Sequence, residues 1–200
     1  FRGAFTGASR DEQRRLFAEA KALGEDEIAF LERGRPSAAG RLTALKRVNG
    51  APALYFWAAV SWGQWALAHG KLAAVRQGAA ARVRDLAQTA IDLDPEYEQG
   101  SGFVILGRLH DQTPRIPFLT FWVSRAQAFQ NLRRAHAISP KNTVTQFFLA
   151  DAILRHDVKQ RGEAERLLRE CAQAPPRASH QVEDTHYSAK ARERLKETTP

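Results

Sequence analysis

The sequence predicts an all-α protein built from helical hairpins, and three observations carry this prediction. Ala, Leu and Arg are abundant, and all three favour helix. Apolar residues recur at helical spacing along the whole chain and no segment keeps a two-residue alternation, so we predict no strand. Three helix ends share small residues ahead of a proline, which is the register of helices that pack in pairs.

Caps and breakers set the expected helices of the first half of the chain. Ser9 with Glu12 forms a capping-box pattern, and Gly24 is a typical helix terminator. Pro52 suits a first helical position, and Gly78 is the weak point of the long helix that follows. The expected helices run from Ser9 to Leu23, from Asp26 to Arg33, up to Val48, from Pro52 to His69 and from Leu72 to Leu93, with breaks at Gly34, Pro36, Gly40, Asn49-Gly50 and Gly70.

The second half of the chain contains the same kinds of signals. Asp94-Pro95 ends the long helix, and Pro114 with Pro117 brackets an irregular stretch that reaches Trp122. Ser124 with Gln127 repeats the capping box. The expected helices open at Ser101 and pass His110, run from Ser124 to Ser139-Pro140, open at Asn142 and carry Leu154, run from Glu163 to Ala174 ahead of Pro175-Pro176, and span Val182 to Glu197.

The charge of the chain favours anionic partners without requiring nucleic acid. The formal net charge is +8, yet most arginines alternate with Glu and Asp on helix faces, which is typical of solvated helices with weak ion pairs. No block of like charge has the length of a nucleic-acid tail, so we expect no nucleic-acid partner. The largest local excess lies between residues 101 and 150, where the basic side chains Arg108, Arg115, Arg125, Arg133, Arg134 and Lys141 face only Asp111.

Cysteine and methionine usage bears on redox chemistry and on processing. Cys171 is the only cysteine, so no internal disulfide forms and a cysteine-cluster zinc site is excluded. The chain starts at Phe1 and contains no Met, so we expect a processed or trimmed segment of a longer product, for which a removed signal peptide is one of two explanations. The apolar segment from Ala51 to Ala68 has its tryptophans in the middle, which favours a buried helix over a membrane span.

The three helix ends repeat one another. Ala90-Ile91-Asp92-Leu93-Asp94-Pro95 resembles Ala135-His136-Ala137-Ile138-Ser139-Pro140, and Cys171-Ala172-Gln173-Ala174-Pro175-Pro176 is a looser copy. Upstream of each, a large apolar residue precedes a small one, in the pairs Trp62-Gly63, Leu106-Gly107 and Leu149-Ala150. The small residues allow two helices to approach closely, and the proline turns the chain into the next pair.

This register resembles the tetratricopeptide repeat, which has an L-G pair in its first helix, an Ala in its second and a closing Pro. Pro95, Pro140 and Pro176 are 45 and 36 residues apart, against a family period of 34, so the repeats are degenerate and carry insertions. We expect a short α-solenoid in which residues 1–50 form short helices packed on the array, residues 51–178 form three degenerate hairpins and residues 179–200 form a capping helix.

A more specific resemblance covers residues 45–175. The run from Pro52 to Ala59, the group Trp62-Gly63-Gln64-Trp65-Ala66, and Leu93-Asp94-Pro95-Glu96-Tyr97 with Gly100 and Gly102 are similar to the TatT family, tetratricopeptide proteins associated with TRAP-type transporters. The resemblance implies a periplasmic, lipid-anchored helical protein that partners a periplasmic solute-binding protein, forms a trimer and holds a hydrophobic cleft. Residues 1–50 depart from the family pattern.

An aromatic group on the fourth expected helix is the first candidate site. The group consists of Tyr55, Phe56, Trp57, Trp62 and Trp65; at helical spacing Tyr55, Trp62 and Trp65 fall near one face, while Trp57 points elsewhere. Such side chains either line a pocket for an apolar ligand or pack in the core, and the sequence leaves both interpretations open.

A second candidate flanks the proline-bracketed insertion. Arg108, His110, Arg115 and Trp122 lie on either side of a loop that interrupts a repeat, a place that often carries function. The planar fork of an arginine suits a carboxylate or phosphate. The alternative is a set of exposed arginines with a histidine at a helix end, where the helix dipole favours it.

The enzymatic alternative is a metal-dependent phosphohydrolase of the HD type, which is also all-α. His110-Asp111 and His156-Asp157, with His69 and Asp184, are the ligands it would use. Both dipeptides are expected at helix ends, and Cys171 occupies a small-residue packing position with no adjacent His. Gly100-Ser101-Gly102 is too short for a phosphate loop.

The sequence therefore predicts a non-enzymatic binding or scaffold protein without cofactor or metal. The first hypothesis is a periplasmic accessory to a TRAP-type transporter that binds a solute-binding protein and a small apolar organic acid. The second is a cytosolic tetratricopeptide adaptor that binds a peptide.

Overall fold

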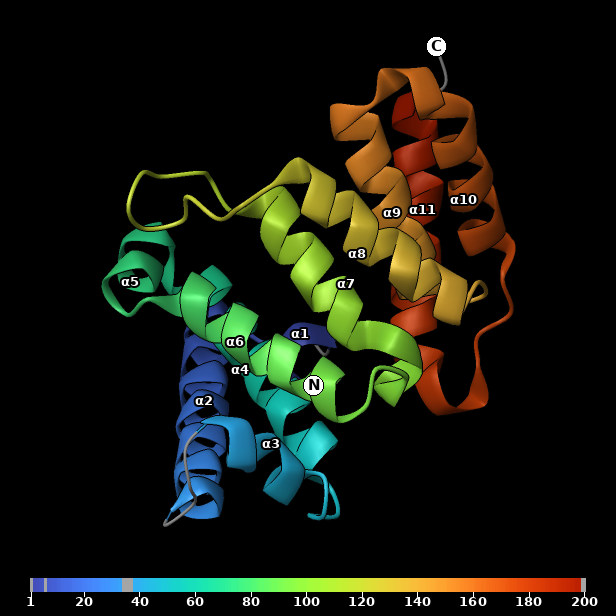
Figure 1. Cartoon of the computed structure of the whole chain (residues 1–200). Coiled ribbons are helices and arrows are strands. Elements are labelled where there is room, and N and C mark those ends of the chain that lie inside the picture. The colour runs from blue at the N-terminus through green and yellow to red at the C-terminus, as the bar shows by residue number, and fades with distance from the viewer. Residues whose placement is uncertain (1, 6, 34–37, 199–200) are drawn as a thin grey trace. The chain divides into compact units, whose positions relative to one another are not determined.

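The computed structural model describes residues 2–5, 7–33 and 38–198 (Figure 1). These residues form helices joined by turns and loops, and they include no strand. The all-α prediction is therefore confirmed for these residues. The chain divides into two compact units. Unit 1 comprises Phe1–Glu98 and Ile116–Phe121, and unit 2 comprises Gln99–Arg115 and Trp122–Pro200.

Unit 1 is organised around one apolar helix. Its helices are α1 (Arg2–Phe5), α2 (Arg10–Glu32), α3 (Ala38–Leu45), α4 (Ala51–His69), α5 (Lys71–Arg76) and α6 (Ala79–Leu93). Helix α4 packs against both α2 and α6. A helix covered on two sides is apolar over most of its circumference, and Tyr55, Phe56, Trp62 and Trp65 of α4 are all buried.

The start of α2 is confirmed, but its predicted end is wrong. The Ser9 hydroxyl accepts a hydrogen bond from the Glu12 amide at 3.2 Å, as the capping pattern predicts. The helix then continues through Gly24 to Glu32. A Cβ on Gly24 would lie 3.2 Å from the Cβ of Ala58 in α4, so this glycine lets two helices approach instead of ending one. Gly34 and Pro36 lie outside the described residues.

Two other glycines were assigned the wrong role by sequence. Gly40 lies inside α3, where a single glycine is tolerated at modest cost, so the break predicted there is absent. Gly78 has φ +63°, and a left-handed residue cannot continue a right-handed helix. The predicted helix from Leu72 to Leu93 is therefore two helices, α5 and α6, and Gly78 directly precedes the second.

Unit 2 contains the remaining long helices. They are α7 (Tyr97–Gln112, the first two residues of which belong to unit 1), α8 (Arg125–Ile138), α9 (Thr143–His156), α10 (Arg161–Gln173) and α11 (Gln181–Thr198), with short 3-10 turns η1 (Val158–Gln160) and η2 (Ala178–His180). Helix α10 packs between α9 and α11, and α9 also packs on α8. Leu149, Ile153, Leu167 and Leu168 are fully buried at the centre.

The helix ends of unit 2 follow the prediction with two differences. Helix α7 begins at Tyr97, ahead of Ser101, and Glu98, Gln99 and Gly100 have φ of 47°, 59° and 77°, so its opening turn is left-handed. Ser124 precedes α8 as expected, but its side chain makes no capping hydrogen bond. The cap at Asn142 is confirmed, because its side-chain oxygen accepts hydrogen bonds from the backbone amides of Val144 and Thr145.

The repeat register has a structural basis in the second helix of each pair. The positions twelve, eight and five residues before the closing proline are buried in α6, α8 and α10 alike; they are Val83, Ala87, Ala90, Ala128, Leu132, Ala135, Ala164, Leu168 and Cys171. These spacings place three residues on one helical face. The stacking of the pairs as a solenoid stays a prediction.

The large-small pairs of the first helices are less uniform. A Cβ on Gly107 of α7 would lie only 2.6 Å from Cγ of Leu132 in α8, and Ala150 of α9 is fully buried. Gly63 of α4, in contrast, has open space around it. Close helix approach therefore explains the small residue in two pairs of the three.

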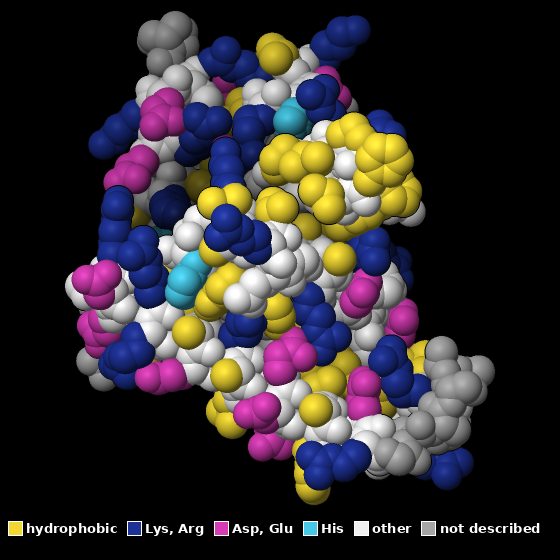
Figure 2. All heavy atoms as spheres, turned by 90° about the vertical axis from the view of Figure 1, so that its left-hand side faces the viewer, with side chains coloured by type: hydrophobic (Ala, Val, Ile, Leu, Met, Phe, Trp, Pro, Cys, Tyr) yellow, Lys and Arg dark blue, Asp and Glu magenta, His cyan; other side chains and the backbone are white. Residues whose placement is uncertain are grey.

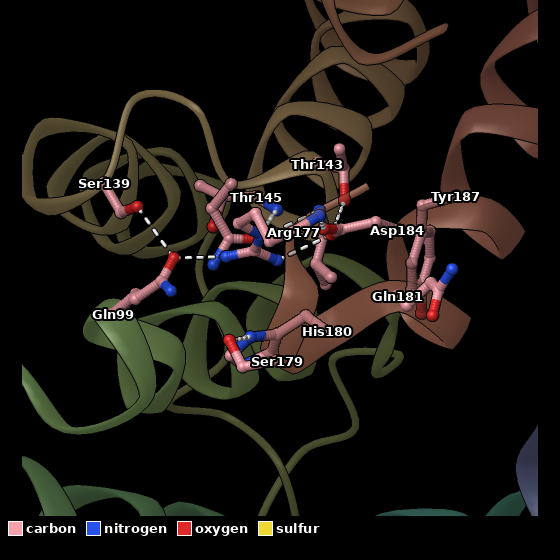
Figure 3. A network of polar contacts seen from close by, with 12 residues as sticks. Gln99, Ser139, Thr143, Thr145, Arg177, Ser179, His180, Gln181, Asp184 and Tyr187 are labelled. Atoms are coloured by element: carbon pink, nitrogen blue, oxygen red, sulfur yellow. Dashed lines mark hydrogen bonds and ion pairs between the residues drawn. The ribbon is translucent and has the colours of Figure 1, made fainter. Parts of the chain in front are cut away.

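A buried carboxylate joins four segments of unit 2 (Figure 3). Asp184 of α11 is completely buried. It accepts from the Thr143 hydroxyl at 2.6 Å and from the Arg177 backbone amide at 2.7 Å. The Arg177 guanidinium donates to it through Nε at 2.8 Å and through a terminal nitrogen at 2.6 Å. Arg177 also binds the side chain of Gln99, which accepts from Ser139 at 3.0 Å.

The acidity of Asp184 reflects this set of donors. Burial alone raises the pKa of a carboxyl group, and it is the largest single influence here. The hydrogen bonds from Arg177 and Thr143 act together in the other direction and leave the pKa of Asp184 below its ordinary value. The network thus ties the first turn of α7 and the starts of α9 and α11 to one another.

We predict that Gly107→Ala destabilises the protein by about 2 kcal/mol, because the added methyl group overpacks the buried Leu132. The matched variant Gly63→Ala adds the same methyl group to a helix where nothing opposes it, and should stabilise by about 0.5–1 kcal/mol through helix propensity. Urea unfolding of both variants measures the difference. Equal effects of the two substitutions would contradict close packing at Gly107.

We predict that Asp184→Asn costs about 3 kcal/mol at neutral pH, because it leaves the Arg177 guanidinium without its counter-charge. Since the pKa of Asp184 is lowered by folding, its contribution is complete above the unfolded-state pKa of about 3.9 and is lost as pH falls through the folded value. The stability gap between wild type and variant should therefore shrink as pH falls below about 4.

Glu193→Gln is the control for this measurement. Glu193 is exposed on the same helix, and its substitution should change the free energy of unfolding by less than about 0.5 kcal/mol. A gap between wild type and Asp184→Asn that stays constant down to strongly acidic pH would show that Asp184 is not ionised in the native state.

Candidate functional site

The aromatic candidate group belongs to the core of unit 1. Tyr55, Phe56, Trp62 and Trp65 are buried, and only Trp57 is substantially exposed, at 43%. The Trp62 and Trp65 rings meet edge to face with centroids 5.8 Å apart. This arrangement favours the packing interpretation of the group over a ligand pocket.

Polar partners complete the burial of these aromatic rings. The Trp62 indole donates to Glu25 of α2 at 2.5 Å, and Arg82 of α6 donates to both oxygens of that carboxylate at 2.8 and 2.7 Å. Burial raises the pKa of Glu25, but the hydrogen bonds from Arg82 and Trp62 together lower it below the ordinary value. The Lys21 ammonium lies 4.1 Å from the Trp62 ring centroid.

Tyr55 also lines a polar cavity of about 330 Å³ between α2, α3, α4 and α6. Its hydroxyl donates to Glu32, and Arg41 pairs with the same carboxylate at 3.2 Å. Burial is the main reason that the pKa of Tyr55 is raised. Because Arg82, the second arginine of the cavity, is held by Glu25, the arginines here already have carboxylate partners.

Arg108 in unit 2 is in a different situation. Its guanidinium carbon lies 3.9 Å from the ring centroid of Phe148 on α9. Its Nε atom is buried without a hydrogen-bond partner, and no carboxylate of the described residues lies within ion-pair distance of it. Burial lowers the pKa of this guanidinium. Arg108 is therefore a partly buried cation that packs on an aromatic ring without a carboxylate in contact, and its charge is favoured only from a distance by Asp111 and Asp151.

The surroundings of Arg108 are aromatic. Two residues of α9, Phe147 and Phe148, form a cluster with Tyr187 of α11, and the ring centroids are 5.2–5.5 Å apart. Burial raises the pKa of Tyr187, and the nearby charge of Arg108 acts against this rise. Helices α7, α9 and α11 thus supply one cation and an apolar, aromatic wall.

The acidic groups closest to Arg108 along α7 and α9 are committed to other bases. Asp111, whose side chain is 3% exposed, lies 2.8 Å from Nε2 of His156 and 2.8 Å from Arg155. Asp151 pairs with Arg155 and lies 3.2 Å from Arg194. These pairs form a ladder across α7, α9 and α11 in which Asp111 and Asp151 attract Arg108 only from a distance, without an ion pair.

The remaining residues of the second candidate group lie apart from Arg108. His110 follows it by two positions, which places the two side chains on different faces of α7. His110 accepts from the Ser124 amide at 3.2 Å, and its ring meets that of Trp122 edge to face at 5.4 Å. The pair fastens the end of the insertion to α7. Arg115 is exposed in the loop. The structure therefore brings His110 and Trp122 together but not with Arg108.

The residues of the enzymatic alternative do not converge. Asp111 and His156 are neighbours, but Asp184 is enclosed by Arg177 and Thr143. Within the described ranges, no group of three or more His, Cys, Asp or Glu side chains has the arrangement of a metal site. Cys171 is buried, and this burial raises the pKa of its thiol to about 12. A thiol in this state is a poor nucleophile.

Sequence reasoning missed Phe148 and Tyr187 as neighbours of Arg108. Their positions in apolar helical patterns indicate burial, but nothing local indicates that they face an arginine from another helix. Among the described helices, α4 included, none is long and apolar enough to cross a membrane.

No protein-family model matches this chain, and no curated protein matches its sequence.

Proposed function

We propose that the chain is a non-enzymatic helical binding protein whose unit 2 recognises the carboxylate of a small apolar organic acid through Arg108. The observation that carries this proposal is the arginine itself, which is largely desolvated over Phe148 and has no anionic partner. The proposal makes the carboxylate of a ligand the missing counter-charge.

The energetics favour an anionic ligand over a neutral one. Removing a guanidinium from water is costly, and a cation–π contact returns only about 1–2 kcal/mol. A carboxylate accepts two parallel hydrogen bonds from the planar fork of an arginine, which adds geometric fit to charge neutralisation. A ligand that brings this group gains more here than at an exposed arginine, where water competes.

The aromatic neighbours favour an apolar body on the ligand. Phe148 and Tyr187 lie beside Arg108 as packed aromatic rings with little exposed surface, and binding sites for small organic molecules combine aromatic side chains with a few polar groups that fix orientation. Since Asp111 and Asp151 are held by Arg155, His156 and Arg194, they do not compete for the cation.

The similarity to the TatT family suggests the cellular process in which such a ligand would be bound. A periplasmic accessory of a TRAP-type transporter would receive or deliver such an acid by way of a solute-binding protein. The register of the three buried helix faces described above supports the repeat on which that similarity rests, and the partner remains a proposal from the resemblance.

We predict that octanoate binds the wild-type chain and that Arg108→Gln weakens this binding by about 10- to 100-fold, which is the loss of a hydrogen-bonded charge pair. Titration calorimetry with octanoate, and with octanamide as the neutral analogue, makes the measurement. Octanamide should bind weakly to both proteins. Arg134→Gln is the matched control, because Arg134 is exposed on α8, and it should bind octanoate as the wild type does.

The same variant separates binding from folding. Because Arg108→Gln removes a desolvated charge without a partner, it should unfold at or above the wild-type temperature. Equal octanoate affinity in wild type and Arg108→Gln, or no carboxylate binding by the wild type at millimolar concentration, would refute the proposal.

The partner proposal has a separate test. We expect a solute-binding protein encoded beside this chain to co-purify with it and to bind at tens of micromolar or tighter. Absence of binding between the two purified proteins in that range would remove the transport setting and leave the carboxylate site to be judged by its own titration.

A further inference from the structure

Unit 1 has a group of large apolar side chains that lie exposed outside its buried core, here named the apolar patch. It consists of Leu67 at the end of α4, Leu72 and Val75 of α5, and Phe118, Leu119 and Phe121 of the insertion. Segment 116–121 belongs to the same compact unit as α5, and Figure 1 shows it beside that helix. Figure 2 shows hydrophobic side chains gathered on this face.

The exposure of the patch is built into the backbone. The Ile116 amide donates to the Thr120 hydroxyl at 2.8 Å, and the Thr120 amide donates back to the Ile116 carbonyl at 2.9 Å. Thr120 is buried, and Phe118 at the turn has φ +64° and is 95% exposed. A left-handed conformation at a bulky residue is costly. The turn therefore lowers the stability of the fold while it holds the Phe118 side chain in solvent.

The charges around the patch have one sign along the chain. Residues 51–84 and 112–150, which contain all six patch residues, include no Asp or Glu. Lys71 and Arg76 are exposed at the two ends of α5, and Arg115 directly precedes the turn segment. From α2, Lys21 donates to Gln77 at 2.7 Å and so adds another cation beside α5. These cations favour an occupant that is apolar and anionic together, although α2 also brings Asp11 to the end of α4 through Arg14, which donates to the Ala68 carbonyl.

We propose that the apolar patch docks on the surface of an anionic lipid bilayer, with Phe118 and Leu119 inserted among the headgroups. Peripheral membrane sites combine inserted Phe and Leu side chains with Lys and Arg at headgroup level. A protein partner fits less well, because a side chain as open as Phe118 forms no groove with its neighbours. This inference does not depend on the carboxylate site at Arg108.

Vesicle co-sedimentation of the full chain tests the proposal. The wild type should sediment with vesicles of phosphatidylcholine and phosphatidylglycerol, and much less with phosphatidylcholine alone. Phe118→Asn combined with Leu119→Ser should lower the partition coefficient at least tenfold. Asn tolerates the left-handed conformation, so this variant keeps the turn, and an unchanged unfolding temperature verifies that it does.

The basic residues and a matched aromatic residue complete the design. Lys71→Gln with Arg76→Gln should weaken binding to the mixed vesicles by roughly fivefold per charge, and high salt should do the same to the wild type. Phe30→Ser is the control, because Phe30 is 69% exposed on α2 but lies between Glu27 and Glu32. It should bind as the wild type does.

Several outcomes would overturn the inference. They are failure of the wild type to sediment with mixed vesicles, equal sedimentation with neutral vesicles, and equal losses in Phe30→Ser and the Phe118 variant. A concentration-dependent dimer that the Phe118 variant abolishes, without vesicle binding, would assign the patch to self-association instead.

Discussion

Two helices approach closely only where side chains at their contact are small, and the packing of both units depends on this constraint. In unit 2 the contact is so tight at Gly107 that even a methyl group would overlap Leu132. In unit 1 Gly24 has the same role against Ala58. The positions of these small residues fix which faces of the helices meet, and the larger apolar side chains fill the space that remains. The polar network at Asp184 then holds the first turn of α7 and the starts of α9 and α11 in place in unit 2.

The buried charged residues differ in whether they have a partner of opposite charge, and this difference distinguishes the structural residues from the candidate site. Glu25, Asp111 and Asp184 are each held by at least two donors from other segments. In each case the donors compensate the cost of removing a carboxylate from water. Arg108 lacks such compensation, and this contrast within one molecule, more than its position next to an insertion, makes it the candidate for ligand binding.

The helices could be predicted from the sequence because their signals are local. Ser9, Asn142 and the proline after each buried face act within a few residues, and they mark the ends correctly. Gly24 and Gly78 could not be told apart, since one glycine serves a contact with another helix and the other a left-handed turn. Ser124 has the right residue type for a cap, but the bond depends on a side-chain conformation that sequence does not specify. Likewise, the sequence singles out Arg108 by its charge and by its place beside the insertion, whereas its neighbours Phe148 and Tyr187 come near only in the tertiary fold.

The division of the chain into units has a topological consequence. The polypeptide passes from unit 1 to unit 2 after Glu98, returns for Ile116–Phe121 and leaves again. Residues 1–98 alone are thus an incomplete version of unit 1, because its last segment is synthesised only after α7. A ribosome has to synthesise the chain as far as Phe121 before that unit has all its parts, so the two units mature as interleaved pieces. A single protease cut within residues 116–121 would leave each fragment with parts of both units.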